Sequence, residues 1–230
     1  GLGLWHSHSL DCGSNAVIGN NCLTNEYGDL VDMMGASRSA HYNSFQKERL
    51  GWLNAGASPP ITTVTSDGTY TMEAYETLSL GPKAVKILKS TDPSTGAKSW
   101  YYVEARKALG FDSFINNEPS QNILNGVLVH RATDGNGDSG HLLDMTPATP
   151  VYYWWYDPAL VVGQSFIDST SGVTITANSV SSSGASVTVR YALGVTVSTD
   201  QASYNRTQTV AITAIVQSAG SPVVKASVTF

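Results

Sequence analysis

The sequence predicts a mainly β protein built around an antiparallel β-sandwich. Short aromatic and β-branched runs, such as 100–104 and 126–130, lie between clusters of Gly, Pro and Asp, which is typical of strands. Residues 172–176 and 185–190 alternate between apolar and polar side chains, and the turn-like residues 181–184 join them, which indicates a hairpin. Many short strands at this spacing are typical of two packed antiparallel sheets.

Composition excludes several classes of function. The chain has 230 residues with 13 Lys+Arg and 18 Asp+Glu, so its formal charge is −5, and only 13% of the residues are charged. Such a sparse, slightly acidic surface is not typical of proteins that bind nucleic acid or anionic lipid. No stretch approaches the roughly 20 apolar residues of a membrane-spanning helix. We therefore expect a folded protein with no nucleic-acid partner and no membrane span.

Residues 1–56 form the first of three expected parts. They are rich in Gly and Asn, contain both cysteines, and include one predicted helix over 38–53 with Ser39 as its N-cap. The segment 57–60 contains two prolines and indicates a linker or a sharp turn. Residues 57–192 are then expected to form the β-sandwich domain.

Residues 193–230 contain a second series of strands, predicted over 195–197, 209–214 and 223–230. Three or four strands are too few for an immunoglobulin-like domain of about 100 residues, so we interpret this part as an incomplete domain of that kind. The chain begins at Gly1 without a starting Met and ends on an alternating, strand-like pattern. We therefore expect it to be a fragment of a longer protein.

The two cysteines, Cys12 and Cys22, stand ten positions apart among Gly, Ser and Asn residues. A disulfide that closes a small surface loop is the favoured interpretation, and it indicates an extracytoplasmic protein. Two free thiols are the alternative. A zinc site that also uses His6 and His8 is a third interpretation, although the spacing matches no common zinc-ribbon pattern.

The N-terminal residues carry the most specific motif. Gly3-Leu4-Trp5-His6 has the form G-x-x-H, and Asp32-Met33-Met34-Gly35 follows downstream. In the metzincin zinc motif H-E-x-x-H-x-x-G-x-x-H, a helix carries the first two His. The Gly permits the turn that directs the third His at the same metal ion. The second element resembles the Met-turn, whose Met forms an apolar floor below the zinc.

The whole N-terminal part resembles the gametolysin (autolysin) branch of metzincin metallopeptidases of the bacterial secreted type. The resemblance is strong over residues 1–53 and moderate onward to about residue 190. The similar segments are 9–13, 26–29, 47–53, 126–130 and 142–147. The fold that this implies is the C-terminal remnant of a metzincin α/β catalytic domain, followed by the β-sandwich and the incomplete immunoglobulin-like domain.

The resemblance implies a secreted zinc endopeptidase that hydrolyses peptide bonds in a protein or peptide substrate, with an extracellular surface or matrix as a further target. His6 would be the third zinc ligand, Gly3 the turn and Met34 the floor, and Cys12–Cys22 would brace the loop after His6. In the family the metal activates a water and a Glu takes its proton. That Glu and the first two His would precede Gly1, so this chain holds no catalytic base. We expect the chain alone neither to bind zinc tightly nor to cleave peptides.

Four further candidates have two interpretations each. His8 is either a competing ligand or an exposed histidine, and Met33 replaces Met34 if the register slips by one. Tyr42 either stabilises an oxyanion or packs on the core. Residues 134–140 place oxygen ligands at alternate positions as a calcium loop does, but Met145 stands where the loop needs Glu, which favours a plain hairpin turn.

The aromatic run 151–156 contains a predicted strand, and its side chains are either a stacking platform for sugars or buried packing residues. For the protein as a whole, the rival to the peptidase is a non-catalytic β-sandwich module for binding or adhesion. A shortened pseudo-enzyme kept for binding is a third interpretation.

Overall fold

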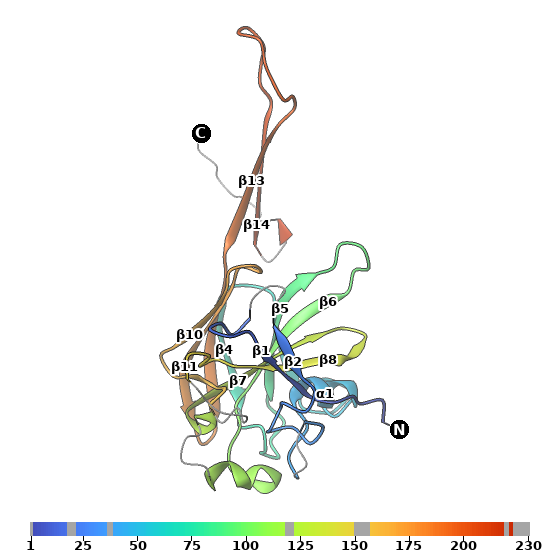
Figure 1. Ribbon diagram of the computed structural model, residues 1–230, viewed down its shortest axis with the longest axis vertical. Coiled ribbons are helices and arrows are strands. Elements are labelled where there is room, and N and C mark those ends of the chain that lie inside the picture. The colour runs from blue at the N-terminus through green and yellow to red at the C-terminus, as the bar shows by residue number, and fades with distance from the viewer. Residues whose placement is uncertain are drawn as a thin grey trace.

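The protein is mainly β, as the sequence predicts, and its strands form two packed sheets and a protruding hairpin (Figure 1). The structure is a computed structural model that describes residues 2–17, 22–35, 39–117, 122–149, 157–218 and 221–222. No helix within these ranges is long and apolar enough to cross a membrane.

The larger sheet has the strand order β2-β1-β8-β7-β6-β5-β3, and the short β9 pairs with β7. These strands are β1 (His8–Asp11), β2 (Leu23–Asn25), β3 (Ile61–Val64), β5 (Ala84–Thr91), β6 (Lys98–Glu104), β7 (Gly126–Thr133), β8 (Asn136–Leu143) and β9 (Leu160–Val161). The sheet is mixed rather than purely antiparallel, because β1 runs parallel to β8 and β3 runs parallel to β5. β3 and β5 are parallel because β4, which lies between them in the chain, belongs to the other sheet.

The smaller sheet packs over one face of the larger one and has the order β10-β11-β12-β4. Its strands are β4 (Gly68–Glu73), β10 (Ser165–Asp168), β11 (Val173–Ser181) and β12 (Gly184–Tyr191). β11 and β12 form the predicted hairpin, and their alternate apolar residues enter the main core between the sheets. Gly184 is required at the turn, because a Cβ there would overlap the carbonyl oxygen of Met72 on β4.

The expected boundary at residue 56 does not separate two cores. β1 pairs with β8 in the register Ser9↔Leu142, so the N-terminal segment supplies strands to the same sheet as the residues after 57. On the sheet face away from the main core, Phe45 packs on Tyr102 with ring centroids 5.7 Å apart. In the described parts of residues 1–192, the segments 1–56 and 57–192 therefore share one sheet and pack together.

The predicted helix is much shorter than expected. α1 spans Ser44–Arg49, and Asn43 rather than Ser39 is its N-cap, with the Asn43 side chain accepting a hydrogen bond from the Gln46 N–H at 3.0 Å. The residues before Asn43 are not helical, because the His41, Asn43 and Ser44 N–H groups donate to carboxylates elsewhere in the chain. Two 3₁₀ helices, η2 (Gly110–Asn117) and η3 (Ile123–Asn125), precede β7.

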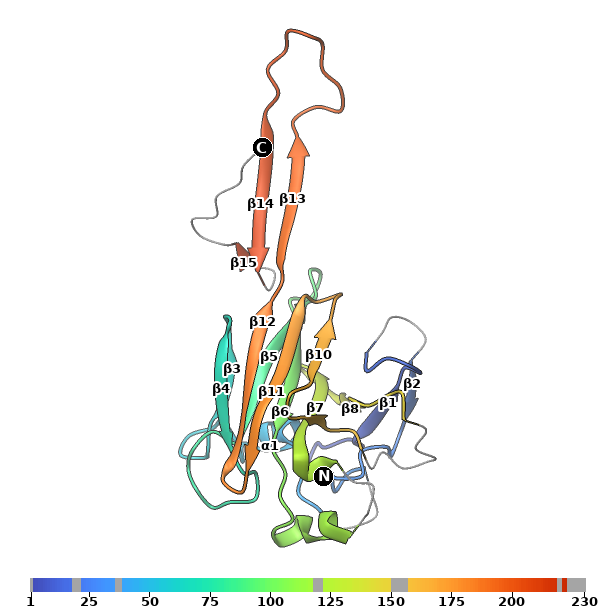
Figure 2. The same cartoon turned by 90° about the vertical axis from the view of Figure 1, so that its left-hand side faces the viewer.

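The chain leaves the sandwich through β12 and continues into a long hairpin that extends away from the body (Figure 2). It consists of β13 (Leu193–Thr199) and β14 (Ile212–Ser218), with the short β15 (Ser221–Pro222) beside β14. This matches two of the strands predicted after residue 193, with shifted ends, but these strands alone do not make an immunoglobulin-like domain. The predicted strand 223–230 and the aromatic run 151–156 lie outside the described residues.

Candidate functional site

The two motif segments lie directly against each other. The Ser7 N–H, next to His6, donates to the Met34 carbonyl at 3.1 Å, and the Asp29 N–H donates to the Ser7 carbonyl at 3.2 Å. Gly35 makes this approach possible, because a Cβ there would overlap the Asp29 carbonyl and lie 2.7 Å from the Ser7 oxygen. The backbone of the G-x-x-H segment therefore runs along the Met-Met-Gly turn.

Gly3 adopts a backbone conformation that favours glycine. Its φ of +71° lies in the left-handed region, which glycine enters without steric cost. A Cβ at Gly3 would meet no atom, so the requirement comes from the backbone and not from crowding. Met34 is half-buried, whereas Met33 is 38% exposed. Of the two methionines, Met34 is thus the more buried.

The His6 imidazole has a partner at each ring nitrogen. Nδ1 lies 2.8 Å from Oε1 of Glu26, and Nε2 lies 3.0 Å from the Tyr27 hydroxyl. The His6 and Tyr27 rings are also in contact, with centroids 4.2 Å apart. Glu26 and Tyr27 precede the Met-turn in the chain and fix the direction of the imidazole.

The described residues do not make a zinc site by themselves. They contain no group of three or more His, Cys, Asp or Glu side chains that could hold a metal ion. His6 supplies one imidazole, and a catalytic zinc site takes three protein ligands. The zinc expected from the sequence therefore has only a single candidate ligand here.

His8 is not an exposed histidine, which corrects the expectation from the sequence. It is 6% exposed on β1, with Nδ1 2.9 Å from the Glu26 carbonyl and Nε2 3.0 Å from Oδ1 of Asp138. Its ring also packs on His141, with centroids 5.1 Å apart. Both nitrogens are thus bound to oxygens within the fold, so His8 is not placed to compete for a metal.

The predicted calcium loop is the turn between β7 and β8. Gly135 at its tip has φ +76°, and Oδ1 of Asn136 accepts the Asp138 N–H at 3.1 Å. Asp134 lies 3.6 Å from Nζ of Lys86, and Asp138 contacts His8. These oxygens have partners inside the protein, which favours the plain hairpin turn over a calcium site.

Two buried aspartates shape the Met-turn. Asp32 accepts the Met34 N–H at 2.6 Å and the Asn43 N–H at 2.5 Å, so its carboxylate is part of the structure of the turn. Asp29 lies beside it and accepts a hydrogen bond from Nε2 of His130 at 2.9 Å. Burial, with a smaller effect of the Asp29 charge, raises the pKa of Asp32 to about 7. The turn therefore holds a proton on or near Asp32 under mildly acidic conditions.

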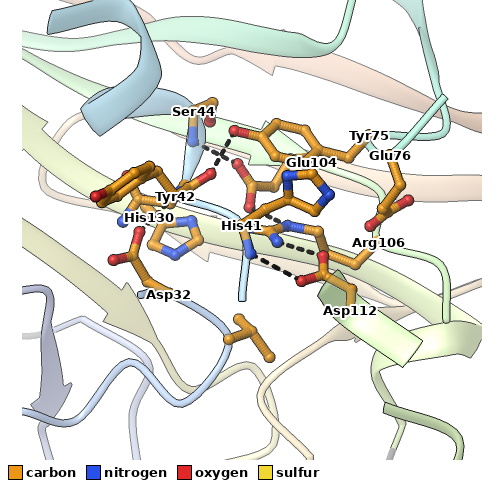
Figure 3. A network of polar contacts seen from close by, with 12 residues as sticks. Asp32, His41, Tyr42, Ser44, Tyr75, Glu76, Glu104, Arg106, Asp112 and His130 are labelled. Carbon is orange, nitrogen blue, oxygen red and sulfur yellow. Dashed lines mark hydrogen bonds and ion pairs between the residues drawn. The ribbon is translucent and has the colours of Figure 1, made fainter. Parts of the chain in front are cut away.

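A fully buried charge network holds the segment between the Met-turn and α1 (Figure 3). Glu104 at the end of β6 accepts the Ser44 N–H at 2.8 Å and Nε of Arg106 at 2.8 Å. Arg106 also donates to Asp112 at 2.5 Å, and Asp112 accepts the His41 N–H at 3.0 Å. The network thus explains why residues 39–43 are not helical.

The electrostatics of this network favour its ionised form. Burial alone would raise the pKa of Glu104, but Arg106, His130 and the Ser44 N–H together outweigh it and hold the pKa at about 2. Sequence reasoning missed these residues. The only signal was a Glu-Ala-Arg sequence directly after the apolar strand 100–103, which also fits an exposed strand end.

Tyr42 is tied to this network by its backbone. Its carbonyl accepts the Tyr75 hydroxyl at 2.7 Å, and its half-buried ring meets Trp52 edge-on at a centroid distance of 5.7 Å. These contacts favour the packing role over the oxyanion role.

Cys12 and Cys22 form a disulfide, with an S–S distance of 2.02 Å. The bond joins the end of β1 to the start of β2, and both cysteines pack against the main core. It therefore braces the segment that follows His6 and His8, in the position that the resemblance implied.

Comparison of the chain with protein-family models, with curated proteins and with solved structures found no match. The functional argument accordingly depends on the residues and on their geometry.

Proposed function

We propose that this chain is part of a secreted zinc metalloendopeptidase of the gametolysin-like type, to which it contributes His6 as a zinc ligand and the Met34 turn beneath it. The observation that carries the proposal is the backbone hydrogen bond from Ser7 to Met34. Two segments that are 27 positions apart in the sequence, counted from Ser7 to Met34, are joined by this bond directly after His6, which supports the proposal. The left-handed Gly3 supports the same assignment.

The partner of His6 also supports it. Metal-bound histidines commonly offer their second ring nitrogen to a carboxylate, which fixes the tautomer and the ring orientation. Glu26 provides such a carboxylate at Nδ1. Nε2 would then be the nitrogen for the metal, and in this chain the Tyr27 hydroxyl takes that place. We infer that Glu26 is a positioning residue for His6.

Secretion and substrate are part of the same proposal. The disulfide favours an oxidising compartment outside the cytosol. A protein or peptide substrate follows from the peptidase assignment, and an extracellular surface or matrix is the expected target. The hairpin after residue 192 would be the beginning of an immunoglobulin-like module.

The test compares the chain with a version extended at its N-terminus by a helix that bears His-Glu-x-x-His directly before Gly1. After dialysis, zinc is measured by atomic absorption, and peptidase activity is measured on a quenched casein substrate. We expect about one zinc per extended chain, with hydrolysis, and little zinc on the unextended chain. The substitution H6A should remove zinc from the extended chain.

H8Q is the matched control, because His8 lies two residues away but has both nitrogens bound inside the fold. It should retain the zinc. A folded extended chain that binds no zinc, or one in which H6A and H8Q behave alike, would contradict the proposal. Circular dichroism of each variant shows whether it is folded.

The second candidate is a non-catalytic module for binding or adhesion. It is favoured by the closed arrangement of His6, whose two nitrogens both have partners within the chain. The same experiment separates the two, because a module of this kind gains no specific zinc site from the added helix.

A further inference from the structure

A polar cavity lies at one end of the larger sheet, and its lining residues are distant from His6 in the sequence. It has a volume of about 360 Å³ and is lined by the end of β5, the start of β6, the end of β7 and the start of β8. Arg131 on β7 is one of the lining residues, and its neighbours in the sheet register are Tyr101 of β6 on one side and His141 of β8 on the other. Because side chains alternate along a strand, Arg131 shares its face with the core residue Val129. The cavity is therefore the polar end of the sandwich interior.

Arg131 is a half-buried cation without a direct polar partner among the described residues, although the charge of nearby Asp168 acts on it. Its guanidinium makes no hydrogen bond and no ion pair with any residue that the structure describes. The contrast is Arg106, which is fully buried and binds Glu104 and Asp112. A guanidinium carries five N–H donors, so that of Arg131 can bind an acceptor that enters the cavity.

The two carboxylates near the cavity are already engaged. Asp168 accepts the Tyr101 hydroxyl and the Ser171 hydroxyl, each at 2.6 Å, and lies 3.3 Å from Nζ of Lys89. Asp138 lies 3.0 Å from Nε2 of His8. Lys89, the second cation of the lining, forms an ion pair with Asp168, whereas Arg131 forms none with a described residue.

The remaining lining offers neutral donors. The Ser99 and Thr133 hydroxyls lie 2.8 Å apart, so one donates to the other and the second hydrogen is available to the cavity. His141 adds no positive charge at neutral pH, because burial above all lowers its pKa to about 4. Its two nitrogens already face the Thr24 hydroxyl and the Ser139 carbonyl.

We propose that this cavity is a binding site for the carboxylate of a monoanionic ligand, with Arg131 as its anchor. The planar guanidinium fork matches a carboxylate in a bidentate arrangement, and the hydroxyls can satisfy polar groups beside it. A dianion such as phosphate fits less well, because only Arg131 among the lining cations lacks an ion pair, and the nearby carboxylates of Asp168 and Asp138 would repel a second negative charge. The volume falls in the range of small-ligand pockets, roughly 300–1,000 Å³. The proposal makes no use of His6 and is independent of the peptidase assignment.

The carboxylate could belong to a free small acid or to an acidic residue of a polypeptide, and the probes distinguish these sources. They are propionate, the blocked peptide acetyl-Ala-Glu-Ala-amide, its Gln counterpart, and inorganic phosphate. Each is titrated into the full chain while NMR follows the Nε–Hε signal of Arg131 and the amides of Ser99 and Thr133. We expect saturable shifts with propionate or the Glu peptide, and weaker binding of phosphate and of the Gln peptide. Tighter binding of propionate identifies a free small acid as the source, and tighter binding of the Glu peptide identifies an acidic residue of a polypeptide.

R131Q should weaken carboxylate binding by roughly tenfold or more, because it removes a charge-assisted pair of hydrogen bonds. K98Q is the matched control for charge. Lys98 is exposed one residue before Ser99, and its Nζ approaches the Trp100 ring on the other sheet face. It should change binding by no more than about twofold, since surface charges are screened. R131K keeps the positive charge but lacks the planar guanidinium, so its carboxylate affinity should lie between those of the native protein and R131Q. If R131Q does not fold, R131K replaces it in the comparison with K98Q. The proposal is overturned by the absence of saturable shifts, by tighter binding of phosphate than of both carboxylates, or by equal effects of R131Q and K98Q.

Discussion

Replacing Arg106 by Met is the sharpest test of the buried network that positions the Met-turn and α1. Arg106 is fully buried between Glu104 and Asp112, both of which are also fully buried. Met has a similar length and no charge, so R106M removes the ion pairs while filling most of the space. Two carboxylates then lose their cation without gaining water.

The expected cost follows from Glu104. Its pKa is about 2 instead of the ordinary 4.5, so the folded environment favours the ionised form by about 3 kcal/mol at neutral pH. Removing one partner of a buried ion pair costs about 3–5 kcal/mol in general, which agrees. For a chain of this size the melting temperature should fall by roughly 6–20 °C.

The pH dependence provides a second, independent signature. In the native protein the folded pKa of Glu104 is depressed, so its contribution to stability is present above about pH 4.5 and is lost as the pH falls toward 2. In R106M, burial still raises the pKa of Glu104, and its largest opposing charge is gone. The folded pKa should then lie above 4.5, and stability should fall as the pH rises through it.

The assay is urea unfolding between pH 3 and 8, followed by tryptophan fluorescence. R190M is the matched control, since Arg190 pairs with Asp67 at 3.4 Å on the surface with 68% of its side chain exposed. Such exposed pairs contribute about 0–1 kcal/mol. The reasoning is refuted if R106M costs no more than R190M, or if both variants keep the acid limb of the native protein.

Two further predictions concern the disulfide and a buried acid. C12S/C22S should lose about 3 kcal/mol of unfolding free energy, which is the chain-entropy value for a loop of about ten residues. Reduction of the native protein should have the same effect in urea titrations. An unchanged urea midpoint would contradict this prediction. Burial first, and then a hydrogen bond with Asp112, raises the pKa of Glu76 to about 8. A raised folded pKa means that stability is lost as the pH rises from about 4.5 through 8, so E76Q, which stays neutral, should flatten this limb. Parallel stability curves for E76Q and the native protein between pH 5 and 9 would show that Glu76 does not titrate in this way.

The sequence predicts those features that depend on neighbouring residues. The hairpin of β11 and β12 follows from strict alternation and a Ser-Gly turn, and both are local signals. The disulfide between Cys12 and Cys22 follows from there being only two cysteines, ten positions apart.

Features that depend on distant partners could not be predicted. The helix begins at Ser44 because carboxylates from η2, β6 and the Met-turn draw the preceding N–H groups out of helical geometry. β1 joins the larger sheet through β8, more than a hundred positions away. Arg106 and Arg131 look alike in the sequence, yet Arg106 forms two buried ion pairs and Arg131 forms none with a described residue, and only the packing of the sheets decides this.

The claim that the Gly3–His6 segment and the Met34 turn belong to a zinc peptidase is tested most directly by the residues that precede Gly1 in the source protein. They are determined by sequencing the source DNA across the codon for Gly1. The account predicts His-Glu-x-x-His ending immediately before Gly1, so that Gly3 and His6 complete the zinc motif. Any other residues at those positions, or a start codon there, would contradict the zinc assignment and leave the binding module as the function to pursue.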